Sequence, residues 1–535
     1  MKPSVDNKMR VDKWVFFPPL AIVLIFCYLI SRDPKKAGDG LQVIFQFITN
    51  ELAGFYMFYV LTVFFIAIYL IFSDLGRKKF GHDKPDFSTG TWLGMLFTCQ
   101  AGLGVLTWTS IEFFYYLQKP AWGLPPFSKE AQAWAAVFPM FHWGFSAFAI
   151  SAVFGVVFAY QFYCKKVLDV RPSTACQYLI GPANAKNWVG KSIDAFFVLG
   201  SFMAIATCIG INAPTLYGIV NQVFKTEIGI VAQSAIVLSF SVFMAVLLYT
   251  GLSKGIKIFS DIRVYVGFAL LAFLLLVGPT SYIVNTFADS VGFLLQNFFR
   301  LSLNTDPYFQ SHTPQDWTVF YWCWYIAMIF SAAIFLARVS KGRSVREYLV
   351  GTILSQTLGS WIFFAVFQNY SMHIYELGTV PIAEIMAAKG QGEAIAAIWS
   401  QIPFISYLLP VIMVYAYMCI QTLLNGQVYT IAMVTTKNLS GFAEPPSWIK
   451  IFWAFALGIA VIALLLIGGI RPFQTVTIIG SLPLVVIATL VLASFFMEIK
   501  RHGWVIRDEI SSLTSAVVEP GVKANEEDHT GVKDE

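Results

Sequence analysis

Long uncharged apolar stretches, separated by short polar segments, follow one another along almost the whole chain. Each of the clearest ones is longer than the roughly 20 residues with which an α-helix crosses a ~30 Å hydrocarbon core. A membrane β-barrel would instead show short segments of alternating polarity. The pattern therefore predicts an all-α polytopic membrane protein. The clearest uncharged stretches are residues 131–164, 195–224, 264–288, 349–375, 394–436 and 472–497.

The apolar maxima predict twelve transmembrane helices. Between the seventh and the eighth, residues 285–304 have the pattern of an amphipathic helix that lies on the outer membrane surface. After the last span, the polar and acidic end of the chain is expected to form a flexible tail. The predicted spans lie near residues 14–31, 52–73, 91–117, 134–162, 193–221, 231–252, 260–283, 317–337, 346–369, 403–432, 448–470 and 472–496.

The distribution of charge sets the expected orientation. The chain has 535 residues, of which 57% are hydrophobic and only 13% charged, about half the charged share of a soluble domain. With both termini on one side of the membrane, about three quarters of the 36 lysines and arginines fall in segments on that side. Because cytoplasmic loops carry an excess of Lys and Arg, we expect a multi-pass membrane protein with both termini in the cytoplasm.

Residues that carry chemistry in other proteins form no recognisable catalytic or metal-binding arrangement. The seven cysteines include no CxxC pair and no Cys/His cluster, and the sequence has no GxxxxGK(S/T) nucleotide-binding loop. We therefore expect no enzymatic activity, no cofactor, no metal ion and no nucleic-acid partner. His142, inside a predicted span, has two interpretations, a hydrogen-bonded structural histidine or a proton carrier.

The third predicted span contains features that are unusual for a membrane helix. Its paired glycines, Gly102 and Gly104, either let a ligand approach the backbone or let another helix pack closely. Glu112 is costly at membrane depth, and such a residue marks a polar cavity or pathway by default. A structural role as the centre of several hydrogen bonds is the alternative for Glu112.

The eighth predicted span opens with six aromatic residues among the nine positions 317–325. One or two would anchor a helix at the membrane interface, so this density calls for a further explanation. On a helix Trp317, Tyr321 and Trp324 share one face. With Trp143 of the fourth span and Tyr115 of the third they would form a cage that binds a quaternary ammonium through the π-faces of the rings. Core packing is the alternative for each single ring.

Two stretches of the sequence resemble the signature of the betaine/choline/carnitine transporter family. They are residues 317–324 and 335–347, and residues 141–144 in the fourth span are a further match. The similarity extends from residue 15 to the twelfth span, which is nearly the whole chain. Within the family the sequence most resembles the carnitine/γ-butyrobetaine antiporter branch. The stretches that carry this closer resemblance are residues 87–89, 110–112, 171–173 and 261–263.

The resemblance implies a leucine-transporter-like fold, in which two inverted repeats of five helices follow two extra helices. It also implies a homotrimer in the bacterial inner membrane, with small quaternary-ammonium substrates and the lipid bilayer as partners. The segments expected on this basis are a cytoplasmic N-tail (1–13), two peripheral helices with a cytoplasmic loop (14–90), the first repeat (91–283), an outer amphipathic helix and loop (284–316), the second repeat (317–497) and a cytoplasmic C-tail (498–535).

Carried over residue by residue, the family's substrate site falls on the third, fourth and eighth predicted spans. Phe148 stands where the family usually has a tryptophan, and its ring keeps a weaker π-face. Ser331 stands where the carnitine branch has a glutamine that helps to hold the substrate carboxylate. The implied central aromatic box is Tyr115, Trp143, Phe148 and Trp324, with Ser331 beside it, and the implied outer vestibule is Trp108, Trp317, Tyr321 and Tyr325.

The sequence also bears on ion coupling. Where sodium-coupled members of the family have hydroxyl side chains in the tenth span, this chain has Leu423, which supplies no oxygen to a hard cation. In the carnitine branch an arginine occupies the vacant sodium position, and Arg263 matches it. An ordinary inner-loop charge is the alternative for Arg263. The branch's methionine at the other cation position is Ala332 here.

These features favour sodium-independent exchange of carnitine, γ-butyrobetaine or a related betaine by alternating access. The alternative is sodium- or proton-coupled uptake of glycine betaine or choline. The tail is acidic and short, whereas osmosensing relatives tend to have a long basic C-terminal helix, and this difference disfavours the alternative. A substrate sensor that binds without transport is a third interpretation.

Overall fold

Helices make up the regular structure of the chain in the computed structural model. Extended pairing among the described residues is limited to two isolated backbone bridges, Val11 with Thr436 and Lys79 with Ser344. A helix satisfies its own backbone polar groups, as a segment in lipid must, so the predicted all-α class is confirmed. The residues that the structure describes are 11–98, 103–249, 253–437, 439 and 443–506.

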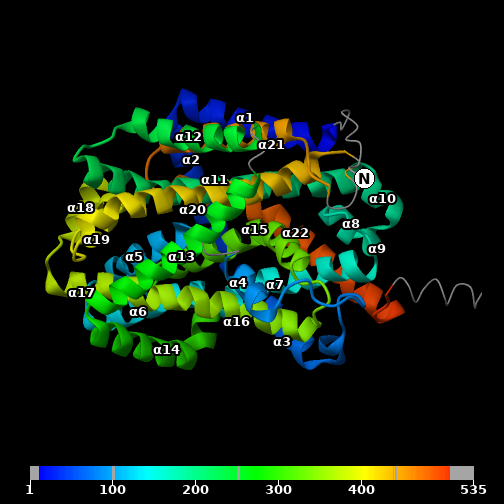
Figure 1. The fold of residues 1–535 in the computed structure, drawn as a ribbon, viewed down its shortest axis with the longest axis horizontal. Coiled ribbons are helices and arrows are strands. Elements are labelled where there is room, and N and C mark those ends of the chain that lie inside the picture. Colours follow the sequence, from blue (N-terminus) through cyan, green and yellow to red (C-terminus); the bar gives the residue numbers. More distant parts are fainter. Residues whose placement is uncertain (1–10, 99–102, 250–252, 438, 440–442, 507–535) are drawn as a thin grey trace, which may run out of the picture.

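Figure 1 shows most of the helices running along the longest axis of the molecule. The elements are α1 (Lys13–Arg32), α2 (Pro34–Glu51), α3 (Ala53–Phe72), η1 (Asp74–Arg77), α4 (Thr89–Thr98), α5 (Leu103–Gln118), α6 (Lys129–His142), α7 (Phe145–Ala159), η2 (Tyr160–Cys164), α8 (Pro172–Ala175), α9 (Gln177–Ile180), α10 (Pro182–Lys186), α11 (Trp188–Phe224), α12 (Ile230–Tyr249), α13 (Ser253–Val277), α14 (Thr280–Ser302), η3 (Pro314–Val319), α15 (Phe320–Arg338), α16 (Val345–Phe363), η4 (Phe364–Gln368), α17 (Asn369–Leu377), α18 (Ile382–Lys389), α19 (Gln391–Trp399), α20 (Ile405–Thr435), α21 (Ser447–Leu465) and α22 (Arg471–His502).

Fewer helices than the predicted twelve meet the length and apolarity of a membrane span. Ten helical stretches of the described chain do so, and the bent pair α13–α14 raises the number to eleven. The span predicted near 91–117 corresponds to two shorter helices, α4 and α5, on either side of residues 99–102, which lie outside the described residues. The third predicted span therefore lies partly outside the described residues.

The chain bends sharply where the predicted outer amphipathic helix begins. Residues 264–277 of α13 and the helix α14 meet at 110°, at Gly278 and Pro279. Proline has no N–H to continue the hydrogen bonds of α13. On α14, the Phe293 ring packs 4.4 Å from that of Trp134 on α6. The expected helix over 285–304 is therefore present, as part of Thr280–Ser302.

The connecting segments meet in two groups at opposite ends of the molecule (Figure 1). One group contains both ends of the described chain, since Val11 pairs with Thr436 and the Trp504 indole donates to the Lys79 carbonyl. In the other group, ion pairs join Lys119 to Asp316, Lys129 to Glu376 and Lys389 to Glu227.

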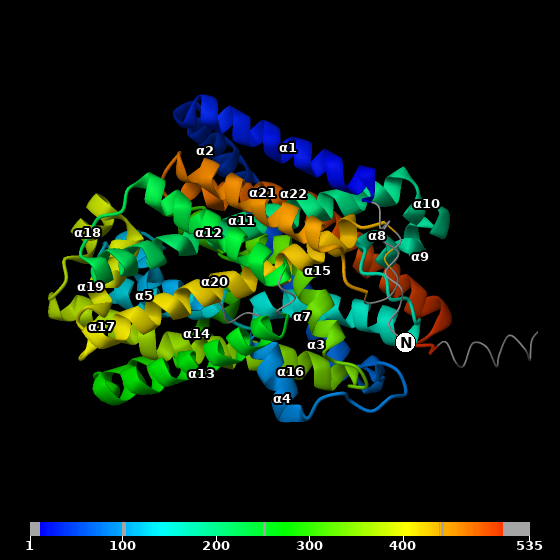
Figure 2. The same ribbon diagram turned by 45° about the horizontal axis from the view of Figure 1, so that its top comes forward.

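The long helix α11 lies at the centre of the bundle, and Figure 2 shows α1 and α21 on the same side of it. Its closest neighbour is α19. A Cβ atom on Gly218 of α11 would stand 2.2 Å from the Gly392 carbonyl oxygen, and one on Gly392 would stand 1.9 Å from that of Pro214. Because backbone atoms cannot swing aside, only glycine permits this approach. It brings the first turn of α19 against the C-terminal part of α11.

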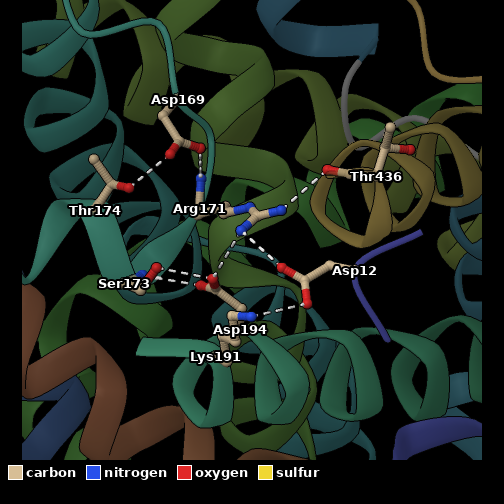
Figure 3. A network of polar contacts seen from close by, with 8 residues as sticks. All are labelled: Asp12, Asp169, Arg171, Ser173, Thr174, Lys191, Asp194 and Thr436. Atoms are coloured by element: carbon tan, nitrogen blue, oxygen red, sulfur yellow. Dashed lines mark hydrogen bonds and ion pairs between the residues drawn. The ribbon is translucent and has the colours of Figure 1, made fainter. Parts of the chain in front are cut away.

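A network of polar side chains fastens the start of α1 to α11 and to the end of α20 (Figure 3). Arg171 is its centre. Its guanidinium donates to the Thr436 carbonyl at 3.0 Å and lies 3.5 Å from the Asp12 carboxylate and 4.0 Å from that of Asp194. Asp194, buried on α11, also accepts bonds from the Ser173 amide and hydroxyl at 3.1 and 2.8 Å.

Replacing Arg171 with alanine is expected to destabilise the fold by about 1–3 kcal/mol, because Asp12 and the buried Asp194 lose the cation that they share. Thermal unfolding of the purified protein in detergent measures the effect. Lys186→Ala is the matched control, since Lys186 is exposed and lines the same 700 Å³ cavity as Arg171. Its melting temperature should stay close to that of the parent protein. Equal losses in the two variants would contradict a structural role for the network.

Candidate substrate site

Trp143 occupies the break between α6 and α7. Helix α6 ends at His142, the Trp143 backbone turns away from helical geometry, and Gly144 is in an extended conformation before α7 begins. The indole N–H of Trp143 lies 3.3 Å from the Glu112 carboxylate of α5 and 3.3 Å from the Tyr321 hydroxyl of α15. One side chain thus links α5, α15 and the α6–α7 break.

Aromatic rings surround Trp143 without stacking on it. The ring centroids of Tyr321, Tyr325 and Trp324 lie 6.1, 6.3 and 6.5 Å away, each in an edge-to-face arrangement. The Phe148 ring is 6.0 Å from Tyr325, also edge to face. We call these five residues the aromatic cage. All of them belong to the sequence-predicted site.

A second group of rings adjoins the cage on the side of α5. Trp317 packs 4.7 Å from Tyr115 and 5.7 Å from Trp108. Trp108 in turn lies 6.1 Å from Tyr321, which joins the two groups. The ring contacts therefore divide the predicted residues differently from the resemblance, since Tyr115 was expected in the central box and Tyr321 and Tyr325 in the vestibule.

Tyr115 turns away because it has a hydrogen-bond partner on α19. Its hydroxyl donates to the Gln391 side-chain oxygen at 2.8 Å, and the Gln391 amide donates to the Ile211 carbonyl of α11 at 2.7 Å. Sequence reasoning missed Gln391 because nothing local marks a glutamine 276 residues away as a partner of Tyr115. The contact depends on the glycine-mediated approach of α19 to α11.

Glu112 is fully buried and fully hydrogen-bonded at the edge of the cage. One carboxylate oxygen accepts from the Tyr116 hydroxyl at 2.9 Å, and the other faces the Trp143 indole. His142 lies 3.6 Å from Glu112, and its two ring nitrogens are 2.9 Å from the Tyr116 and Thr318 hydroxyls. Glu112 is therefore a centre of hydrogen bonds that also touches the cage, and His142 has the bonds of a structural histidine.

The side of the cage that Trp324 forms faces α11. The Trp324 indole donates to the Cys208 sulfur at 3.2 Å, and Met328 lies 3.8 Å from the same sulfur. Ser331 follows on the same face of α15, and its buried hydroxyl has no hydrogen-bond partner among the described residues. Cys208 was known from the sequence only as a cysteine in an apolar span, with no signal that it contacts Trp324.

The residues of the coupling hypothesis are placed only in part. Arg263 lies on α13 and Leu423 on α20, but their side chains are outside the described part of the structure. Ala332 is buried on α15. The hydroxyl of Thr422 donates to the Met418 carbonyl of its own helix at 2.8 Å. In the described chain, no three His, Cys, Asp or Glu side chains come together as for a metal ion.

A buried aromatic cage beside a carboxylate has the chemistry that an organic cation needs inside a bilayer. The family model for betaine/carnitine/choline family transporters matches residues 14–503. The chain belongs to this family. It is a multi-pass transport protein rather than an enzyme.

Removing one ring of the cage should weaken substrate binding. Trp324→Ala is expected to lower the affinity for a quaternary ammonium about 2- to 30-fold, because a desolvated cation–π contact contributes ~0.5–2 kcal/mol. Trp324→Phe should retain most of it. Isothermal titration of the purified variants measures the affinity, with Trp188→Ala, a tryptophan 70% exposed on α11, as control. Unchanged affinity in Trp324→Ala would exclude Trp324 from the site.

Proposed function

We propose that the protein is a secondary transporter that exchanges trimethylammonium compounds, namely carnitine, γ-butyrobetaine or a related betaine, without sodium. The observation that carries the proposal is the aromatic cage around Trp143. A trimethylammonium group has no N–H to donate, so the π-faces of several rings are its natural partners. Rings spaced 6.0–6.5 Å between centroids and set edge to face present such faces from several directions.

The position of the cage supports transport by alternating access. It lies on α5, at the α6–α7 break and on α15. The helix is interrupted between α6 and α7, and α15 is preceded by the π-helical turn η3. Transporters commonly place substrate at such interrupted helices near the middle of the bilayer. In this proposal residues 91–283 and 317–497 are the two inverted repeats, the protein is a trimer in the bacterial inner membrane, and both termini are cytoplasmic.

Sodium independence rests on the sequence of the tenth predicted span and on Arg263. Leu423 offers no oxygen where a sodium ion would need ligands. A fixed guanidinium at Arg263 would supply a permanent positive charge in place of the ion. Exchange then needs no ion gradient, since one substrate leaves as the other enters.

One observation favours a second candidate, ion-coupled uptake of choline or glycine betaine. The Glu112 carboxylate lies against Trp143 of the cage, and a negative group at that place suits a substrate that carries only positive charge. Choline fits this description, whereas a betaine must keep its own carboxylate away from Glu112.

Transport by the purified protein in liposomes distinguishes these functions. Vesicles preloaded with unlabelled γ-butyrobetaine should take up labelled carnitine at the same rate with and without a sodium gradient, and empty vesicles should take up little. Vesicles with Trp324→Ala are the matched control and should show much slower exchange. Uptake into empty vesicles that follows the sodium gradient would refute the exchange proposal and support the second candidate.

A further inference from the structure

Asn212 brings a polar group of α11 to the cage. It lies one helical turn after Cys208, the residue that receives the Trp324 indole hydrogen bond. From another direction, a Cβ atom built on Gly104 would lie 3.6 Å from the tip of the Trp143 ring and 3.7 Å from the Asn212 side-chain nitrogen. Asn212 thus lies on the Trp143 side of the cage, beside the space at Gly104, and one helical turn from the residue that is bonded to Trp324.

The orientation of this amide follows from its one hydrogen bond. The Asn212 side-chain nitrogen donates to the Cys208 carbonyl at 2.7 Å. Because a carbonyl oxygen only accepts, the NH₂ group must face it and the Oδ1 atom must point the other way. The glycine at position 104 leaves the space beside the amide without a side chain.

The Oδ1 atom of Asn212 is buried and has no donor among the described residues. Buried acceptors in native proteins are nearly always paired, so this oxygen calls for a partner. The buried hydroxyls of Tyr325 and Ser331 are likewise without partners in the described chain, but a hydroxyl can either donate or accept. An amide oxygen accepts only. Its partner must carry a hydrogen-bond donor.

We infer that Asn212 accepts a hydrogen bond from a hydroxyl group of the substrate, so that the site prefers hydroxylated trimethylammonium compounds to the same compounds without the hydroxyl. Carnitine and choline both carry a hydroxyl two carbons from the ammonium nitrogen. With the ammonium against Trp143, a group at that distance reaches toward the Asn212 amide, which shares the space beside Gly104 with the tip of that ring. The inference deepens the proposed function and rests on it for the placement of the ammonium in the cage.

Two matched pairs of compounds test this preference. L-carnitine and γ-butyrobetaine differ by the hydroxyl alone, and choline and propyltrimethylammonium differ by a hydroxyl replaced with a methyl group. Isothermal titration of the purified full-length protein gives the ratio of affinities within each pair. We expect the hydroxylated member to bind about tenfold more tightly, as one hydrogen bond to a buried acceptor provides. A ratio near one in every pair that binds overturns the inference without the use of any variant.

Variants of Asn212 locate the cause of the preference. Asn212→Leu keeps the approximate size of the side chain and removes the acceptor, so the ratio of affinities within a pair should fall to about one. Asn212→Ala should give the same ratio and serves if the leucine variant fails to fold. A ratio that stays near ten in either variant overturns the assignment to Asn212.

Asn369→Leu is the control for a merely structural effect. Asn369 of α17 is also buried, donates to a carbonyl of a neighbouring helix, that of Ile283, at 3.2 Å, and has an unpartnered Oδ1 among the described residues. It has no contact with the cage, so this variant should lower the melting temperature and leave the ratio unchanged. If the wild type binds the choline pair and neither carnitine compound, the proposed function fails, and the choline ratio alone decides the inference.

Discussion

The candidate substrate site depends on one constraint, the need to satisfy a carboxylate that is buried inside a membrane protein. Removing an ionised group from water is costly unless its oxygens are paired, and Glu112 is paired by Tyr116 of its own helix and by Trp143. These bonds fix the indole of Trp143 at the α6–α7 break, where it faces Tyr321 and the rest of the cage. The hydrogen bonds of Glu112 therefore help to position Trp143, and a change at Glu112 would remove one of the two partners of its indole.

Close backbone packing of α19 against α11 positions the residues on the other side of the cage. Helix α19 approaches α11 only because Gly218 and Gly392 lack side chains, and this approach brings Gln391 to the Ile211 carbonyl and to the Tyr115 hydroxyl. Tyr115 is thereby held against Trp317, away from Trp143. The same stretch of α11 presents Cys208 to Trp324. Hydrogen bonds on one side and glycine contacts on the other thus place aromatic residues that attract one another only weakly and without strong direction.

Local pattern predicted much of the fold, and long-range contacts decided the rest. Apolar length alone indicated most of the spans, since lipid requires self-satisfied helices, and the spacing of phenylalanines indicated the helix over 285–304. The aromatic residues of the predicted site do lie together in the structure, but their grouping differs from the prediction, because the Tyr115 hydroxyl donates to Gln391. Helical periodicity shows which side chains share a face, not which distant glutamine or cysteine they meet.

The position of Ser331 bears on the length of the substrate. Under the proposed function the ammonium lies among the cage rings near Glu112, and repulsion by that carboxylate drives the anionic end of a betaine away from it. Ser331 lies seven residues after Trp324 on the same face of α15, or about 10 Å along the helix, and its hydroxyl is free of partners in the described chain. Glycine betaine, with one carbon between its charged groups, spans little of this distance, whereas the three-carbon spacer of carnitine and γ-butyrobetaine spans more. The distance between Ser331 and the cage near Glu112, more than the chemistry of either, thus favours the longer betaines.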